Sequence, residues 1–309
     1  MVPSAEGAAT PASIAVIINP ISGTGGRIDV ARARAGQARA LLASRGADPA
    51  DVFITERAGH AYELAKNAVD RGMSTVVAWG GDGTMNEIGS ALAFSDAALA
   101  LVPSGSGNGL ARELEVPFDA AAALAVAFDG QTRTIDAGEI GGRLFFNIAG
   151  IGLDARVAHR FAVDGLEKRG FARYIAITIR ELAANRPETL TVSTPATSIS
   201  KPALLLAIAN GRQYGNGAVI APRARLDDGL LDIVHIAGRS LVRAVAELPL
   251  VFMGLVDHVA GVTTERAESV EVKSPYPVVY HLDGEPIAGT LTISARVRPA
   301  ALKIRVPTA

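Results

Sequence analysis

The chain has 309 residues, a length that suits one large domain or two ordinary ones. Its 49% hydrophobic and 20% charged residues are typical of a globular protein and exclude a disordered one. The net charge is −1, so no overall field attracts nucleic acid, and we expect no nucleic-acid partner. The absence of cysteine excludes disulfides, thiolate metal sites and cysteine nucleophiles, and it fits a reducing cytoplasm, where we expect the protein to reside.

The first part of the chain alternates predicted strands and helices. Short β-branched runs predict strands at residues 13–19, 52–55, 74–79 and 98–102. Helical spacing of apolar residues predicts helices at 28–44, 61–71 and 84–92, and a helical turn at 109–115. Repeated strand–helix–strand units predict an α/β domain with a parallel sheet, which binds its ligand at the carboxyl ends of the strands.

After residues 129–130 the pattern changes to short β-rich segments separated by Gly, Pro and Asp turns. This pattern predicts a mainly antiparallel β-sandwich, interrupted by helical insertions near 155–185 and 240–259. We place the boundary near Ala137. Residues 1–137 would form a nucleotide-binding domain and residues 138–309 the sandwich, whose last strand could return to the first domain.

Three glycine-rich loops follow predicted strands of the first domain, at residues 19–26, 80–90 and 103–109. Each alone could be a tight turn, but parallel strands bring their C-terminal loops to one edge of the sheet, where glycines let backbone N–H groups approach phosphates. Neither the lysine-containing P-loop nor the dinucleotide-binding fingerprint is present. Asp82 lies inside the second loop, and a carboxylate beside phosphates indicates a nucleotide together with Mg²⁺.

Four motifs occur in an order that resembles the diacylglycerol kinase catalytic family, which includes sphingosine and ceramide kinases and bacterial lipid kinases. They are Asn19-Pro20-x-Ser22-Gly23, Gly80-Gly81-Asp82-Gly83-Thr84 with Asn86-Glu87, Gly105-Ser106-Gly107-Asn108, and Leu282-Asp283-Gly284-Glu285. The resemblance covers essentially the whole chain. It implies an ATP- and Mg²⁺-dependent kinase that phosphorylates a lipid hydroxyl, either of a diacylglycerol-like lipid or of a sphingoid base or ceramide.

The resemblance also implies roles for individual residues. It assigns ATP binding to Asn19, Thr55, Gly80, Gly81, Asp82, Gly83, Thr84, Met85, Asn86 and Ser106. Glu285 matches the general base that accepts the proton of the lipid hydroxyl, and Asp82 is a rival for that role. A simple Asp-Gly hairpin turn is the structural alternative for the segment before Glu285. The third loop departs from many bacterial relatives, because Gly109 replaces an acidic residue.

The resemblance also implies a second metal site, near the segment Asp228-Gly229-x-x-Asp232. By resemblance, Arg225, Asp228 and Leu230 would hold a structural Mg²⁺ through a carboxylate and backbone carbonyls. An ordinary turn between strands explains the same residues equally well.

A lipid acceptor implies peripheral contact with a membrane surface. Basic residues between Arg160 and Arg186 alternate with aromatic ones and could touch an anionic membrane, although a helix with a solvated basic edge explains them as well. Residues 248–256 are a second candidate for lipid contact, with core packing as the alternative. A homodimer, a kinase of a soluble acceptor resembling NAD kinases, and a catalytically silent nucleotide-binding relative also stay open.

Overall fold

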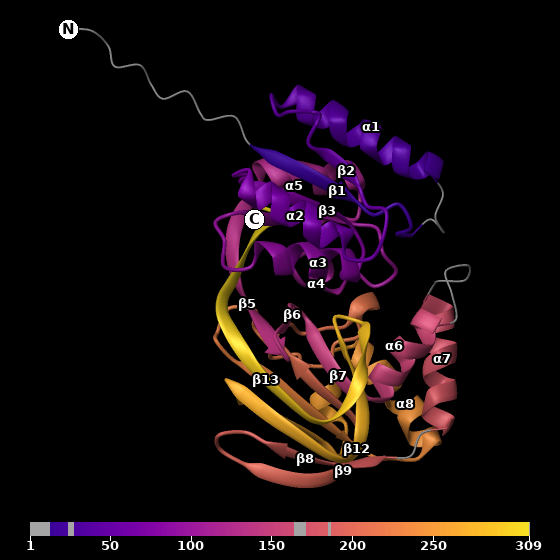
Figure 1. Ribbon diagram of the computed structural model, residues 1–309. Helices are drawn as coiled ribbons and strands as arrows, with labels where there is room; N and C mark the ends of the chain where they lie inside the picture. The colour runs from indigo at the N-terminus through magenta and orange to yellow at the C-terminus, as the bar shows by residue number, and fades with distance from the viewer. Residues whose placement is uncertain (1–12, 24–27, 164–170, 185–186, 309) are drawn as a thin grey trace, which may run out of the picture.

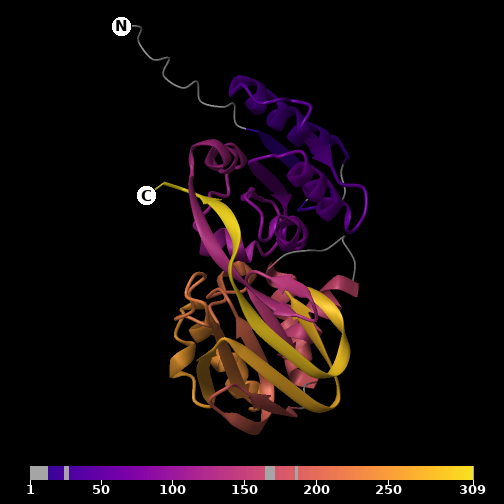
Figure 2. The same cartoon turned by 60° about the vertical axis from the view of Figure 1, so that its left-hand side comes forward.

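The computed structural model describes residues 13–23, 28–163, 171–184 and 187–308. It has two halves stacked along one axis, an α/β half that carries the N-terminus and a β-rich half (Figures 1 and 2). The predicted fold class is confirmed.

The N-terminal half contains a parallel sheet with the order β2-β1-β3-β4. Its strands are β1 (Ile14–Ile18), β2 (Val52–Ile54), β3 (Thr75–Gly80) and β4 (Ala98–Pro103). Every residue of β1 and β3 is buried, as expected for continuous apolar runs covered on both faces of a parallel sheet. The helices are α1 (Ile28–Ser44), α2 (His60–Asp70), α3 (Asp82–Leu92), α4 (Gly109–Glu113) and α5 (Ala120–Asp129).

Two long strands connect the halves. β5 (Gln131–Ile140) pairs antiparallel with β13 (Glu285–Val306), and the far end of β13 pairs in parallel with β4. The last strand therefore joins both sheets into one continuous ladder. Ala137, the expected boundary, lies within β5 and is buried, so the chain passes between the halves as a strand and not as a loop linker.

The C-terminal half consists of antiparallel strands with three helices on one side (Figure 1). Its strands are β6 (Arg143–Phe145), β7 (Ile148–Gly152), β8 (Glu188–Ser193), β9 (Ser198–Ala209), β10 (Leu231–Ala237), β11 (Val262–Ala267) and β12 (Ser269–Leu282). The helices are α6 (Leu153–Val163), α7 (Phe171–Ala184) and α8 (Leu241–Phe252), with short 3₁₀ helices η2 (Gly215–Gly217) and η3 (Val256–His258).

The hydrophobic core has three parts. One fills the N-terminal half, one lies within the β-rich half, and the third lies where α6, α7 and α8 cover β9 and β10. Within the described ranges, no helix combines the length and the apolar character needed to span a bilayer.

Candidate functional site

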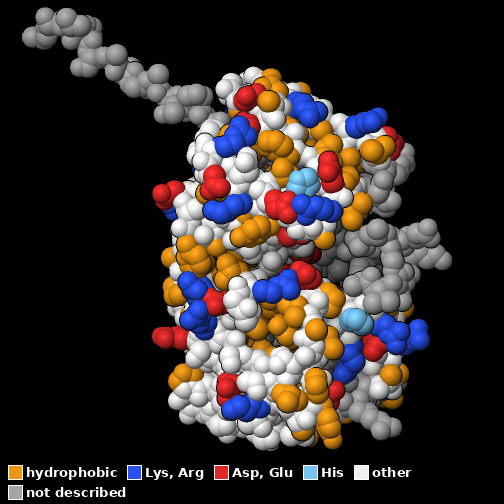
Figure 3. Space-filling model, viewed as in Figure 1, with side chains coloured by type: hydrophobic (Ala, Val, Ile, Leu, Met, Phe, Trp, Pro, Cys, Tyr) orange, Lys and Arg blue, Asp and Glu red, His pale blue; other side chains and the backbone are white. Residues whose placement is uncertain are grey.

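A cleft of about 390 Å³ lies between the two halves. The three glycine loops of the N-terminal half line one side of it, and residues near 147, 154, 214–216 and 281–285 line the other. Figure 3 shows this hollow, with acidic side chains beside it. The predicted convergence of the three loops is therefore observed, and the second half completes the site.

The second and third loops pack too closely for side chains at their contact. A Cβ on Gly105 would lie 2.6 Å from the Cα of Gly81, so only glycine fits there. The third loop is closed by Asn108, which has a left-handed backbone (φ 55°); its Oδ1 accepts a hydrogen bond from the Gly105 N–H at 2.9 Å. This backbone-to-backbone contact leaves the loop amides near the cleft without side chains in the way.

Asp82 holds the third loop against the second. Its two carboxylate oxygens accept hydrogen bonds from the backbone N–H groups of Asn108 (2.8 Å) and Gly109 (2.7 Å). Burial raises the pKa of the Asp82 carboxyl, the two backbone hydrogen bonds oppose that rise, and the nearby Asp283 carboxylate adds to it. Asp82 also lines the cleft.

Asp283 anchors the hairpin turn that precedes Glu285. The turn residues Asp283 (φ 47°) and Gly284 (φ 86°) both have left-handed backbones, as a two-residue hairpin turn between paired Leu282 and Glu285 requires. The Asp283 carboxylate accepts hydrogen bonds from four donors: the N–H groups of Phe146 (2.8 Å), Asn147 (2.9 Å) and Ile148 (3.1 Å), and Nδ2 of Asn86 (2.9 Å). Burial raises its pKa, while these hydrogen bonds oppose the rise. The Asp283-Gly284 hairpin turn, expected as the structural alternative for this segment, is therefore present, and it directly precedes Glu285.

Glu285 lines the cleft at the start of β13. Its side chain is half exposed, and Oε2 lies 3.1 Å from Nη2 of Arg143. The carboxylate is therefore accessible to a ligand in the cleft, and an arginine at the rim holds it.

A buried polar cluster lies deeper in the cleft. Oδ2 of Asp154 accepts a hydrogen bond from the Tyr214 hydroxyl at 2.7 Å and lies 3.3 Å from Nε2 of His281. The Gly284 N–H donates to Nδ1 of His281 at 3.2 Å. A backbone N–H can only donate, so Nδ1 accepts, and the neutral imidazole carries its proton on Nε2, where it donates to Asp154.

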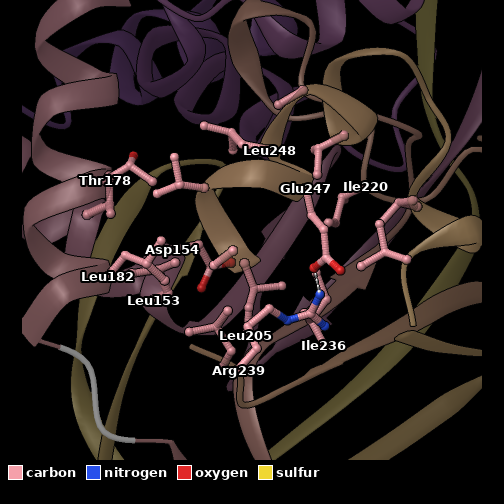
Figure 4. A pocket seen from close by; sticks show the side chains of 18 of the residues that line it. Leu153, Asp154, Thr178, Leu182, Leu205, Ile220, Ile236, Arg239, Glu247 and Leu248 are labelled. Atoms are coloured by element: carbon pink, nitrogen blue, oxygen red, sulfur yellow. Dashed lines mark hydrogen bonds and ion pairs between the residues drawn. The ribbon is translucent and has the colours of Figure 1, made fainter. Parts of the chain in front are cut away.

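An apolar pocket with a volume of about 130 Å³ adjoins this cluster in the C-terminal half. Asp154 and Tyr214 line both the cleft and the pocket. The pocket walls come from α6, α7, α8, β9 and β10, and Figure 4 shows Leu153, Leu182, Leu205, Ile220 and Leu248 among its lining side chains. A polar cleft and an apolar pocket thus meet at Asp154.

The residues predicted to bind ATP divide into two groups. Those that line the cleft are Asn19, Gly81, Asp82, Gly83, Thr84 and Ser106. The other four lie behind or beside it: Met85 is buried, Gly80 packs on the Thr84 side chain, Thr55 is buried after β2, and Asn86 contacts Leu144 and Asp283. Asn19 is held by Thr84, with Nδ2 donating to Oγ1 at 2.8 Å.

The predicted structural metal site lies away from the cleft, in the loop before β10. Oδ1 of Asp228 accepts a hydrogen bond from the Leu230 N–H at 3.2 Å, and Oδ2 contacts Arg266. Asp232 is 1% exposed and its oxygens have no hydrogen-bond partner, although Arg266 Nε lies 3.4 Å away. Burial raises the pKa of Asp232. Arg266 is therefore the cation that lies against both Asp228 and Asp232, and Arg225 extends its side chain toward Asp227. Within the described residues no cluster of three or more acidic, histidine or cysteine side chains is arranged to hold a metal ion.

Several residues of the site were not predicted from the sequence. These residues come from three separate segments: Asp154 from α6, Tyr214 from the loop before η2, and His281 and Asp283 from the end of β12 and the turn that follows it. The position of His281 directly before the Leu-Asp-Gly-Glu motif was an available signal; Asp154 and Tyr214 lie outside the quoted motifs. Of the predicted basic stretch, Lys168, Arg169 and Arg186 lie outside the described residues.

Comparisons with known proteins agree with this architecture. The model of the "Diacylglycerol kinase catalytic domain" matches residues 13–140, and that of the "YegS C-terminal NAD kinase beta sandwich-like domain" matches residues 147–306. A relative in Pseudomonas fluorescens named "Probable lipid kinase YegS-like" is 35% identical over 279 residues, covering 88% of this chain and 91% of its own. A relative of the same name in Pseudomonas aeruginosa is 33% identical over 266 residues, covering 83% and 84%.

Solved structures share the fold at lower sequence identity. A crystal structure from Bacillus anthracis described as a diacylglycerol kinase aligns with a TM-score of 0.68 at 18% identity, covering 96% of this chain and 97% of its own. Another structure from that organism reaches a TM-score of 0.79 at 20% identity, covering 97% of each chain. With both family models matched in order and relatives above 30% identity along most of the chain, the chain belongs to the YegS-like lipid kinase family, with a diacylglycerol kinase catalytic domain.

Proposed function

We propose that this protein transfers the γ-phosphoryl group of ATP, in the presence of Mg²⁺, to the hydroxyl of a membrane lipid. The observation that carries this proposal is the junction at Asp154, where the cleft with its three glycine loops meets an apolar pocket. A phosphoryl donor in the cleft and a hydrocarbon chain in the pocket would bring the lipid hydroxyl between them. Reaction by direct transfer needs this proximity.

The charge of the cleft supports a requirement for Mg²⁺. Among the described residues that line it, four are acidic (Asp82, Asp154, Asp283 and Glu285) and none is lysine or arginine. A polyphosphate would meet repulsion there unless a cation accompanied it. Asp82 and neighbouring loop backbone groups would hold Mg²⁺–ATP, and the ion would neutralise charge that develops on the transferred group. The loop before β10, with Arg225, Asp228 and Leu230, would hold a separate structural Mg²⁺ through the Asp228 carboxylate and backbone carbonyls.

Glu285 is the stronger candidate for the base. Each oxygen of Asp82 accepts a hydrogen bond from a backbone N–H group, so this carboxylate is fixed between the two loops and has its remaining lone pairs for a cation. Glu285 projects from an anchored turn into the cleft and is accessible. The Glu285 carboxylate would separate from Arg143 and accept the proton of the lipid hydroxyl. The hydroxyl oxygen would form a bond to the γ-phosphorus as the bond from that phosphorus to the bridging oxygen breaks and ADP leaves.

The lipid acceptor implies that the protein works at a membrane surface as a peripheral protein, in the cytoplasm where ATP is available. The acidic cleft alone would also fit a soluble acceptor, as in a kinase of NAD. The apolar pocket favours the lipid, because a soluble nucleotide has no hydrocarbon chain to occupy it. A catalytically silent relative would not need the accessible Glu285 carboxylate in the cleft.

Replacing Glu285 with glutamine tests the chemistry. We expect Glu285→Gln to lower kcat by ~10²-fold or more while the affinity for Mg²⁺–ATP stays unchanged, since general-base catalysis contributes about that much. Glu271→Gln is a matched control, because this glutamate lies on β12 away from the cleft and pairs with Lys273. Loss of nucleotide binding in Glu285→Gln, or full activity, would show that Glu285 is not the base.

A further inference from the structure

The apolar pocket contains a buried ion pair at one end. Nη1 of Arg239 contacts Oε2 of Glu247, and both residues line the pocket. The Arg239 side chain is 7% exposed and that of Glu247 18% exposed. Figure 4 shows the pair facing the lumen, on the side opposite Thr178 and Leu182 of α7. Charges in an apolar pocket are costly to bury, so their position has consequences for what the pocket accepts.

Strand register places this pair away from the cleft. Asp154 lies against Gly150, which pairs with His281 on one side and with Ala207 on the other. Nε of Arg239 donates to the carbonyl of Ala237, which is in register with Ala203. The four residues from Ala207 to Ala203 span about 13 Å along β9, at roughly 3.3 Å per residue.

The lining between these two ends is almost entirely apolar. Leu204, Leu205, Ile220, Ile236, Leu248 and Val251 contribute to it. A chain that enters at Asp154 therefore passes apolar side chains and then meets the ion pair. Glu247 is held twice, because Nε of Arg243 also donates to Oε1 at 2.8 Å. Burial opposes ionisation of Glu247, yet hydrogen bonds from Arg243 and Arg239 lower its pKa, so the charged pair persists at neutral pH.

We propose that the Arg239–Glu247 pair sets the maximum length of the acceptor's hydrocarbon chain. This inference rests on the proposed lipid acceptor and names a specificity determinant within its pocket. Each methylene that enters the apolar segment gains about fourfold in affinity, from ~0.8 kcal/mol per buried CH₂. A methylene that reaches the ion pair gains nothing, because it would separate or desolvate two charges.

The test uses saturated 1-monoacylglycerols of increasing chain length, with binding measured by displacement of a fluorescent fatty acid. Wild-type affinity should rise about fourfold per added methylene and then stop rising at one chain length. In the double variant Arg239→Met/Glu247→Leu the rise should continue to longer chains. Both residues are replaced together because removal of Glu247 alone would leave the Arg239 charge without this partner, and removal of Arg239 alone would leave Glu247 charged and paired with Arg243.

Arg243→Leu is the matched control. This change removes a partner of Glu247, but Arg243 is 53% exposed and does not line the pocket. The affinity of Arg243→Leu should therefore stop rising at the same chain length as that of the wild type, which we call the break. If a thermal melt shows that the double variant is unfolded, Arg239→Gln/Glu247→Gln keeps a polar pair of similar size without charge and should shift the break in the same direction.

The outcomes separate this inference from the proposed function. An unchanged break in the folded pair variants overturns it, as does a wild-type affinity that is independent of chain length. Phosphorylation of the same lipids is measured in parallel. A break that shifts with the pair while wild-type protein phosphorylates no lipid would support the length limit and refute the kinase assignment.

Discussion

Replacement of Asp283 by alanine should both destabilise the protein and impair catalysis. The change removes the acceptor of four hydrogen bonds and leaves three buried backbone donors, at Phe146, Asn147 and Ile148, without a partner. At about 1–3 kcal/mol for each unsatisfied donor, the three backbone donors together cost about 3–9 kcal/mol, while Asn86 keeps its hydrogen bond to the Leu144 carbonyl. Relief from burying a carboxylate offsets part of this cost, so we expect a loss of about 3 kcal/mol.

The pH dependence of this loss has a defined sign. Burial raises the pKa of Asp283 above its ordinary value of 3.8, so the folded state holds the proton more tightly than the unfolded state. The Asp283 contribution to stability is therefore greatest below pH 3.8 and declines as pH rises through the folded pKa. The difference in unfolding free energy between wild type and Asp283→Ala should widen as the pH falls through that window.

Urea unfolding at several pH values, together with kcat, checks this reasoning. The control Asp96→Asn changes an exposed carboxylate paired with Lys303 and should leave the stability nearly unchanged. Because the turn carries Glu285, kcat of Asp283→Ala should fall at least tenfold under conditions where the protein is folded. A variant as stable and active as Asp96→Asn would refute the anchoring role, whereas a gap that narrows on acidification would contradict the raised pKa of Asp283.

Two further substitutions test how the loops and helices are held. Gly215→Ala should lower kcat/KM at least tenfold, because the added Cβ would lie 2.5 Å from the Cα of Gly107 in the third loop. The control Gly36→Ala adds a Cβ to α1 where the space is open, so it should leave activity unchanged. Equal activity of the two variants would contradict the contact between Gly215 and Gly107. Glu87→Ala should lower the free energy of unfolding by about 1 kcal/mol, measured by urea unfolding. The Glu87 carboxylate accepts hydrogen bonds from the N–H groups of Gly59 (3.0 Å) and Ala61 (3.1 Å) at the start of α2. An unchanged unfolding midpoint would contradict this capping role.

The sequence was sufficient for the α/β half because its strands are continuous apolar runs and its helices carry regular apolar spacing. The helix predicted at 28–44 matches α1, and α3 begins two residues before its predicted start because Gly81 serves as the N-cap. Helix α5 was missed: its sequence is nearly all alanine and other apolar residues, so no polar face marks its period, although Asp119 caps it through the Ala122 N–H.

The site was only partly predictable, for a topological reason. Loops that follow parallel strands must meet at one sheet edge, so the convergence of the glycine loops followed from the pattern. The contributions of Asp154, Tyr214 and His281 depend on how antiparallel strands from the second half pair across β7, β9 and β12. Register of that kind is set by tertiary packing and leaves no local motif.

Transfer of label from γ-labelled ATP would show whether the acceptor is a lipid hydroxyl. The wild-type protein would be incubated with Mg²⁺, ATP and, in separate reactions, diacylglycerol, phosphatidylglycerol, ceramide, sphingosine and NAD, with Glu285→Gln and EDTA as controls. We expect label in at least one lipid and none in NAD, with loss of the lipid label in both controls. Label in NAD with none in any lipid would contradict a lipid acceptor.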